Sequence, residues 1–227
     1  MSSILYMLAI VVAIISICLS INVNSKFKKF SKEPNYRGIT GAEVAERMLR
    51  HAGIYDVVVQ QTGGRLSDHY DPRDKTVNLS KDVYEKATIA SVAVAAHECG
   101  HAIQHHEAYA PLSFRNALFP VANIGSRFGI WIFIIGLLFA EFGAGTILID
   151  IGIAGFALGT AFHFITLPVE FNASKRALVT LRDTNILTES EMPGARKVLA
   201  AAALTYVAAA AAAIIQLLRL IAIRNND

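Results

Sequence analysis

Four long runs of apolar residues divide the chain and alternate with polar segments. They cover about 4–23, 124–139, 147–167 and 198–223. A helix of about 20 apolar residues is long enough to cross the hydrocarbon core of a bilayer, which is about 30 Å thick. The short join at 141–145 makes the second and third runs a hairpin that crosses the membrane and returns. The pattern therefore predicts four transmembrane helices.

The first run has two interpretations. A cleaved signal peptide is disfavoured, because no Lys or Arg precedes the run, the run is long and no Ala-x-Ala cleavage site follows it. Four lysines follow the run at once: Lys26, Lys28, Lys29 and Lys32. By the positive-inside rule they place this flank in the cytoplasm and the N-terminus outside. We therefore expect a transmembrane helix.

The segment from about 34 to 120 has the composition of a small soluble domain. Thr40 and Glu43 have the spacing of a capping box, which marks the start of a helix. Helical and β-branched patterns predict a helix, two strands that can form a hairpin, and a second helix, at 41–51, 56–61, 76–80 and 83–107. The metal chemistry discussed below lies on the second helix.

These elements predict a mainly α membrane protein with about four transmembrane helices and a small α+β cytoplasmic layer. We divide the chain into an N-terminal transmembrane helix, a cytoplasmic α+β segment, a transmembrane hairpin, a cytoplasmic helical segment and a C-terminal transmembrane helix: 1–25, 26–120, 121–168, 169–200 and 201–227.

Composition supports a membrane protein. Hydrophobic residues make up 54% of the chain, charged residues only 17%, and the mean hydropathy is +0.44. The net charge of +3 comes from basic residues beside the apolar runs, which indicates membrane topology and not nucleic-acid binding. Cys18 and Cys99 lie in different kinds of segment and do not suggest a disulfide framework.

The second helix carries a metal-binding motif. His97 and His101 are one turn apart, so both imidazoles can bind one ion from the same helix face. Glu98, next to the first histidine, is the expected general base that takes a proton from the attacking water. A catalytic zinc ion needs a third protein ligand and one open position. The motif predicts a zinc hydrolase.

The residues alone leave the third ligand open. Gln104 and Glu107 stand where a metzincin has glycine and histidine, which excludes that class. Glu170 is favoured, because two membrane crossings return it to the side of the motif. The alternative for Glu170 is a carboxylate that stabilises a helix N-terminus. Other acidic residues in the polar segments are Asp183, Glu189 and Glu191.

The chain also resembles a known family. The similar stretches are His-Glu-Cys-Gly-His-Ala (97–102), Leu-Ser-Asp-His-Tyr-Asp-Pro (66–72), Pro-Val-Glu-Phe-Asn-Ala-Ser (168–174) and Leu-Thr-Tyr-Val-Ala (204–208). They resemble the YugP-type membrane zinc metallopeptidases of bacteria over nearly the whole chain. More distantly, the motif helix, hairpin and later glutamate are similar to the HtpX membrane proteases and the CAAX prenyl proteases. The resemblance implies one zinc ion per chain, with Glu170 as third ligand.

One position departs from the distant relatives. They carry an acidic residue four positions after the ligand glutamate, whereas Ser174 stands here. A carboxylate that supports the ligands is therefore supplied by Asp183 or is absent. His105, one turn beyond His101, is either a further ligand or, as we favour, a solvated helix end.

Two further sets of residues are candidates for roles around the substrate. Donors to the oxyanion, or groups that support the metal ligands, are expected among His163, Arg176, Arg182, Tyr206 and His69. A segment just before the second strand is a candidate to pair with an extended peptide, with a purely structural role as the alternative: Leu66, Ser67 and Asp68.

The sequence thus predicts a zinc endopeptidase of the cell (inner) membrane with its active site facing the cytoplasm. Its expected partners are a peptide or membrane-protein substrate and the lipid bilayer. The alternative is a membrane scaffold or adaptor that keeps the metal for folding, which the intact Glu98 disfavours. An ion transporter is a weaker alternative, because the apolar runs contain few ionisable residues.

Overall fold

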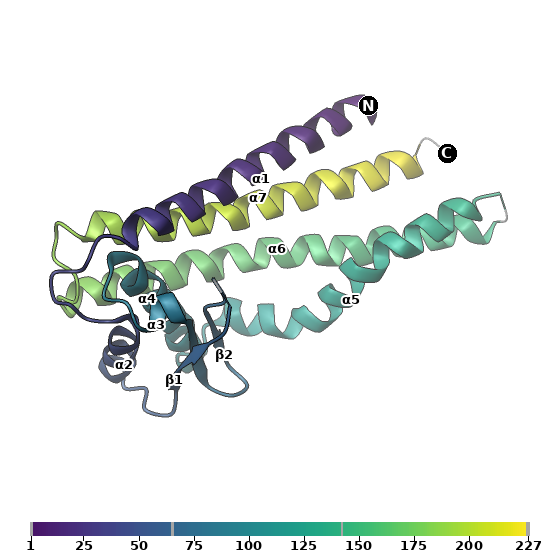
Figure 1. Ribbon diagram of the computed structural model, residues 1–227. Coiled ribbons are helices and arrows are strands. Elements are labelled where there is room, and N and C mark those ends of the chain that lie inside the picture. Colours follow the sequence, from purple (N-terminus) through teal and green to yellow (C-terminus); the bar gives the residue numbers. More distant parts are fainter. Residues whose placement is uncertain (1, 65, 142, 226–227) are drawn as a thin grey trace. The chain divides into compact units, whose positions relative to one another are not determined.

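The computed structural model describes residues 2–64, 66–141 and 143–225. Its elements in chain order are α1 (Ser2–Phe30), α2 (Gly41–His51), β1 (Val58–Thr62), β2 (His69–Asp71), β3 (Thr76–Ser80), α3 (Lys81–Tyr84), α4 (Ile89–His106), α5 (Ala110–Leu138), α6 (Ala144–Asp183) and α7 (Met192–Arg224) (Figure 1). Within these residues, α1, α5, α6 and α7 are long and apolar enough to cross a membrane. The prediction of a mainly helical membrane protein with four such helices and a small sheet is confirmed.

The chain forms two compact units, which we describe separately. Residues 1–19, 113–168 and 205–227 make up the hairpin unit, and residues 20–112 and 169–204 make up the motif unit. Both units draw on α1, α6 and α7, because these helices are longer than a bilayer is thick.

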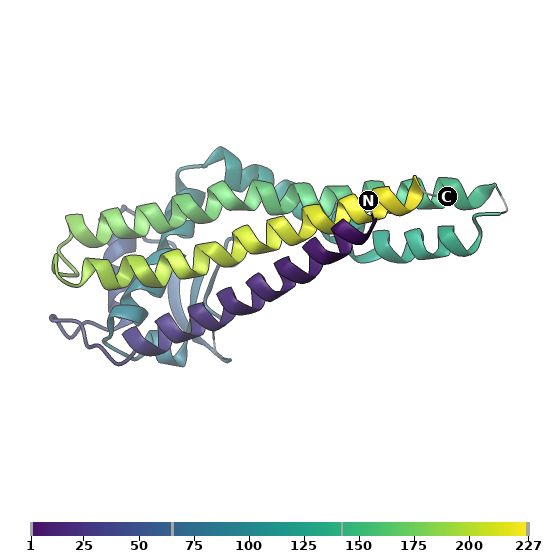
Figure 2. The same cartoon turned by 90° about the horizontal axis from the view of Figure 1, so that it is seen from above.

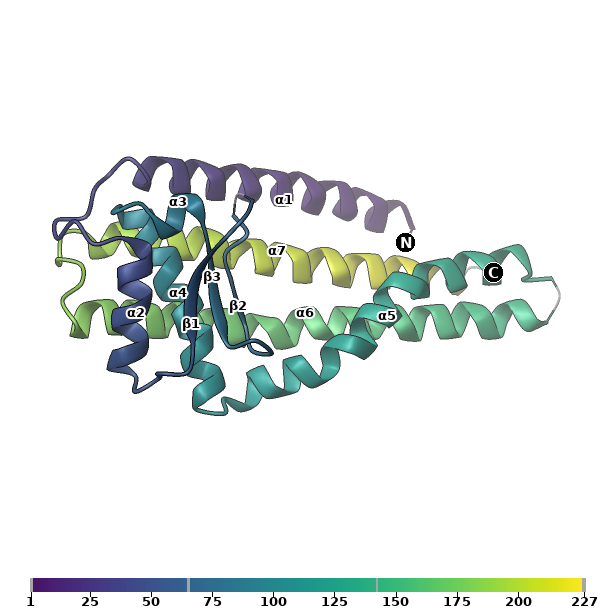
Figure 3. The same cartoon turned by 60° about the horizontal axis from the view of Figure 1, so that its bottom comes forward.

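Glycines bring α5 and α6 close together in the hairpin unit. A Cβ atom added at Gly125 would lie 2.6 Å from the carbonyl oxygen of Gly155, and one added at Gly152 would lie 2.6 Å from the nitrogen of Phe133. Small residues let membrane helices approach until their backbones are in contact. Pro120 lies inside α5, whose ribbon is bent (Figure 3).

The motif unit has a conventional hydrophobic core. The predicted capping box is confirmed, because Thr40 accepts a hydrogen bond from the Glu43 amide and Glu43 accepts one from the Thr40 amide. The helix that it starts, α2, packs against α4. Fully buried side chains of the core come from α2, the sheet and α4: Val44, Met48, Val77, Leu79 and Val92.

The sheet differs from the predicted hairpin. Its strand order is β1-β3-β2, with β1 parallel and β2 antiparallel to β3 (Figure 3). The strands predicted at 56–61 and 76–80 are therefore neighbours but not a hairpin. The hairpin is formed by β2 and β3. Three residues are too few to show an alternating pattern, which is why β2 was missed and His69 was expected in a loop.

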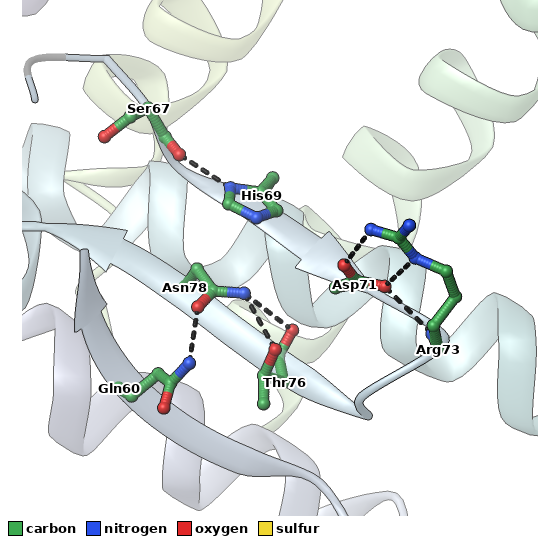
Figure 4. A network of polar contacts seen from close by, with 7 residues as sticks. All are labelled: Gln60, Ser67, His69, Asp71, Arg73, Thr76 and Asn78. Carbon is green, nitrogen blue, oxygen red and sulfur yellow. Dashed lines mark hydrogen bonds and ion pairs between the residues drawn. The ribbon is translucent and has the colours of Figure 1, made fainter. Parts of the chain in front are cut away.

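Polar side chains on this sheet hold neighbouring strands in register (Figure 4). Gln60 of β1 donates a hydrogen bond to Asn78 of β3 at 2.8 Å. Asn78 in turn donates to the hydroxyl of Thr76 at 2.8 Å. The Gln60–Asn78 bond links β1 to β3 through side chains as well as through the backbone, and the Asn78–Thr76 bond lies within β3.

Two predicted helices had wrong boundaries. The first helix continues past residue 23 to Phe30, which is buried in the core of the motif unit. The helix expected over 83–107 is two helices, because a capping box of Thr88 and Ser91 starts α4 at Ile89. The box was missed in the sequence because its second residue is usually Glu or Gln and not Ser. The motif residues were nevertheless predicted on the correct helix, α4.

Pro168 does not end a helix. Figure 2 shows α6 as one uninterrupted ribbon, and Pro168 lies inside it. A proline removes one backbone donor and strains the preceding turn. The residues after it favour helix, and the helix continues to Asp183. Glu170 therefore lies within a helix and not at its start, so the helix N-terminal role considered for it does not apply.

Candidate metal centre

Three possible metal ligands meet in the motif unit. His97 and His101 project from α4, and Glu170 projects from α6. The Nε2 atoms of His97 and His101 lie 3.3 Å and 3.5 Å from the same oxygen of Glu170, Oε2. One ligand atom from each residue lies within 4.8 Å of the others. The structure thus brings together the three residues expected to bind zinc.

A glycine inside the motif allows this meeting. A Cβ atom added at Gly100 would lie 2.5 Å from the carbonyl oxygen of Ala173, closer than packed atoms approach. The backbones of α4 and α6 are therefore in contact one turn beyond Glu170. This contact sets how far the carboxylate of Glu170 lies from the two imidazoles.

The Gly100→Ala protein is expected to bind zinc more weakly and to unfold at a lower temperature. Its methyl group would push α4 from α6, and overpacking of this kind costs about 1–3 kcal/mol. Zinc titration against a chromogenic chelator and a thermal melt measure the two effects. The control is Gly63→Ala, because no atom of the residues that the structure describes lies within 4 Å of a Cβ atom there. Unchanged zinc affinity in Gly100→Ala would contradict the role of this contact.

Gln104 determines which nitrogen of His101 carries a proton. The Gln104 side chain is fully buried, and its amide nitrogen donates to the Val169 carbonyl at 2.8 Å and to Asn172 Oδ1 at 2.9 Å. Its oxygen is therefore left to accept a hydrogen bond from His101 Nδ1 at 3.0 Å. With the proton on Nδ1, Nε2 of neutral His101 presents a lone pair toward Glu170.

Arg176 fixes the other end of this network. Its Nε donates to Asn172 Oδ1 at 2.7 Å, and a guanidinium cannot accept a hydrogen bond. The Asn172 oxygen is therefore identified as the acceptor that Gln104 faces. Arg176 also pairs with Glu107 at 2.7 Å and stacks on Tyr109. Arg176 was expected to be an oxyanion donor or a supporting group. It contacts Asn172, Glu107 and Tyr109, and its role around a substrate stays a prediction.

Ser174 takes the place expected for an acidic residue. Its hydroxyl lies 3.1 Å from Nδ1 of His97, on the side of the ring away from Glu170. The alternative, Asp183, is wrong because it lies 13 residues after Glu170 on the same helix, about 20 Å along its axis. At this position His97 is thus contacted by a hydroxyl group.

The Gln104→Met protein is expected to bind zinc about 10- to 100-fold more weakly, the usual loss when an outer partner of a metal-bound histidine is removed. Methionine has a similar volume but cannot accept a proton from His101, so the ring loses its orientation. Chelator competition measures the affinity. The matched control is Gln61→Met on exposed β1. Equal affinities of the two variants would show that Gln104 does not position the ligand.

The three residues suit zinc. Two imidazole nitrogens and a carboxylate oxygen are a known ligand set for catalytic zinc. With both Nδ1 atoms hydrogen-bonded, both Nε2 atoms face a carboxylate oxygen, and a cation between them removes the repulsion between lone pairs. Burial lowers the pKa of His101, but its contact with the Glu170 carboxylate and the charge of nearby carboxylates raise it on balance. The surroundings therefore favour positive charge at this point.

Glu98 and Cys99 lie inside the motif but are not among the three grouped ligands. Glu98 is only 8% exposed, and this burial raises the pKa of its carboxyl group, while the charges of His97 and His101 lower it. Cys99 is fully buried with its sulfur toward the Ala45 carbonyl at 3.6 Å, and burial raises the pKa of its thiol. Cys99 thus packs against α2.

His105 and the residues before β2 have other partners. His105 Nδ1 lies 2.8 Å from the hydroxyl of Tyr70, which links α4 to β2, and it is not grouped with the metal ligands. Asp68 accepts hydrogen bonds from the amide and hydroxyl of Ser80. Leu66, Ser67 and Asp68 precede β2 and belong to no strand, and their pairing with a substrate stays a prediction.

The remaining predicted residues are spread over both units. His69 is exposed and contacts the Ser67 carbonyl at 2.7 Å (Figure 4). Arg182 pairs with Glu189 at 3.3 Å and lies about 18 Å along α6 from Glu170. His163 and Tyr206 belong to the hairpin unit. Their roles around a substrate stay predictions.

Sequence reasoning missed Gln104 and Asn172 as supporting residues. The available signal was a polar residue three positions after a ligand histidine, on a helix face that is otherwise apolar. Asn172 gives a weaker signal, because it is recognised only when its contact with Gln104 is seen.

Comparison with known proteins assigns the family. A family model described as "Putative neutral zinc metallopeptidase" matches residues 5–225, nearly the whole chain. The chain belongs to this family. Membership agrees with the predicted resemblance and with the three grouped ligands.

A curated relative supports the same assignment. The chain is 45% identical over 204 residues to the "Putative membrane protease YugP" of Bacillus subtilis, covering 90% of this chain and 89% of that protein. No solved structure matches the chain. The name of this relative, a membrane protease, agrees with the four helices of the described residues that can cross a membrane.

Proposed function

We propose that this protein is a membrane-embedded zinc endopeptidase that holds one zinc ion per chain with His97, His101 and Glu170. The observation that carries the proposal is the meeting of these three side chains from α4 and α6, with donor atoms within 4.8 Å. The order of the ligands, a His-Glu-x-x-His helix followed by a distant glutamate, is that of the gluzincin class.

The residues around the ion have distinct tasks. When bound, zinc polarises a carbonyl group and acidifies a water molecule. Glu98 accepts the proton of the attacking water and passes it to the leaving amine. Gln104 and Ser174 hold the two imidazoles with Nε2 toward the ion. Glu170 supplies the third ligand and neutralises part of the charge.

The free edge of β2 is the proposed place for the substrate backbone. Among the described strands, β2 pairs with β3 alone, so its other edge offers unpaired backbone groups beside α4. An extended peptide can add to such an edge as a further strand. This proposal extends the predicted role of Leu66, Ser67 and Asp68 to the adjoining strand, which consists of His69, Tyr70 and Asp71.

The proposed substrates are peptides or membrane proteins reached from the cytoplasmic side of the cell membrane. The lysines at the end of α1 support this orientation, because Lys26, Lys28 and Lys29 follow its apolar part directly. An even number of crossings between α4 and the second half of α6 keeps all three ligands on that side.

A casein or membrane-protein cleavage assay with and without a zinc chelator separates an enzyme from a scaffold. The enzyme is expected to cleave, to stop when the chelator removes zinc and to recover when zinc is returned. Cleavage that chelator leaves unchanged, or a zinc-loaded protein that cleaves neither substrate, would contradict the proposal and favour the scaffold.

A further inference from the structure

A largely apolar groove lies between α6 and α7 within the motif unit. Its volume is about 490 Å³, within the range of small-molecule sites. The groove has mostly hydrophobic walls, formed by Phe171, Leu178, Val179, Met192, Leu199 and Leu204. Three of these side chains, Phe171, Val179 and Leu204, remain 44–49% exposed. An apolar ligand would therefore cover surface that the chain itself leaves open.

Basic side chains border this groove. Lys175, Arg182 and Arg196 are among its lining residues. Arg182 pairs with Glu189 at 3.3 Å. In the part of the chain that the structure describes, no carboxylate lies within ion-pair distance of Lys175 or Arg196. The groove thus combines an apolar wall with two cations available to an anionic group.

Both walls of the groove pass from polar to apolar sequence at the same end. On α6, the apolar run ends near residue 167, just before the groove begins at Phe171. On α7, the apolar run starts near residue 198, inside the lining stretch 192–204. A helix whose sequence changes in this way crosses the membrane surface at that point. The groove therefore lies where headgroups and the first part of the acyl chains are found.

The groove lies next to the candidate metal centre, on the Nδ1 side of His97. Ser174 lines the groove, and its hydroxyl lies 3.1 Å from Nδ1 of His97. The metal-binding atom of that ring, Nε2, points instead toward Glu170. A ligand in the groove would thus touch Ser174 on the Nδ1 side of His97, and not the Nε2 side that faces Glu170. This position disfavours a pocket for the substrate side chain next to the cleaved bond.

We propose that the groove binds an anionic phospholipid of the surrounding bilayer, with an acyl chain along the apolar wall and the phosphate group between Lys175 and Arg196. Basic pockets between membrane helices on the cytoplasmic side are known to hold acidic headgroups. The lipid would fill the space between α6 and α7 next to Ser174, the residue that contacts His97. This inference does not depend on peptide hydrolysis.

Lipid binding by the full-length, zinc-loaded protein tests the proposal. Native mass spectrometry in detergent can compare the retention of phosphatidylglycerol and phosphatidylcholine. The wild type is expected to prefer phosphatidylglycerol. Each basic residue near a headgroup contributes about a fivefold change in affinity, so Lys175→Gln with Arg196→Gln should weaken binding by about 25-fold. Lys197→Gln, a neighbour outside the groove, is the matched control and should leave binding unchanged.

A second variant tests the apolar wall. Ala200→Trp fills the groove while keeping both cations, and it should reduce phosphatidylglycerol retention at an unchanged melting temperature. Equal retention of the two lipids by the wild type would overturn the proposal, as would equal losses in the double variant and in Lys197→Gln. Displacement of phosphatidylglycerol by a cleavable peptide would overturn it too, because the groove would then belong to the substrate.

Discussion

The Glu98→Gln protein is expected to keep about one zinc ion per chain and to cleave peptides about 10²- to 10⁴-fold more slowly than the wild type. General bases contribute to catalysis by about this factor. Glutamine has the shape of glutamate but cannot accept the proton of the attacking water. Because Glu98 is not among the grouped ligands, its replacement should spare the metal. Zinc content by atomic emission and kcat/KM on casein measure both halves of the prediction.

The control for this variant is Glu46→Gln. Glu46 lies on α2 and pairs with exposed Arg50, so its carboxylate is outside the site. Loss of zinc from Glu98→Gln would identify Glu98 as a ligand. Undiminished cleavage by a zinc-loaded Glu98→Gln protein would remove Glu98 from the role of base.

The Glu170→Gln protein is expected to lose zinc. Glu170 is 3% exposed and faces both imidazoles, so its replacement removes the anionic ligand and leaves an ion with two histidines. The loss of affinity should exceed the about 10- to 100-fold typical of an outer partner such as Gln104. Isothermal titration of the metal-free protein with zinc measures it, and activity should return in part when zinc is in large excess.

Glu189→Gln is the informative control, because Glu189 was an alternative third ligand in the sequence. The structure pairs it with Arg182 outside the site, so the variant should bind zinc as the wild type does. The assignment of Glu170 would be wrong if Glu170→Gln kept its zinc while Glu189→Gln lost it.

Local patterns in the sequence predicted most of the helices. Hydrophobic runs located the four long helices, and the Thr40 capping box located the start of α2. Predictions failed where the local signal was a single residue or a very short segment. The division after residue 168 does not coincide with a helix end, because the single donor lost at Pro168 does not stop a 40-residue helix. Strand β2 has three residues and pairs through β3, so its pattern was too short to detect.

The candidate site was predicted in part. The spacing of His97 and His101 on one helix face is a local signal, and it needs no tertiary structure. Glu170 is separated from His97 by 73 positions, so only the contact of α4 with α6 brings the two together. Gln104 contacts His101 within α4, whereas its contact with Asn172 and the contact of Ser174 with His97 join α4 to α6, and such contacts between helices are not a local pattern in a single sequence.

The zinc K-edge X-ray absorption spectrum of the purified protein reports directly on the atoms that bind the ion. We expect only nitrogen and oxygen neighbours at about 2.0–2.2 Å, including the multiple-scattering signal of two imidazoles. Cys99 lies within the motif but faces Ala45, so no sulfur should contribute. A sulfur shell at about 2.3 Å, or a spectrum with one imidazole or none, would contradict a site made of His97, His101 and Glu170.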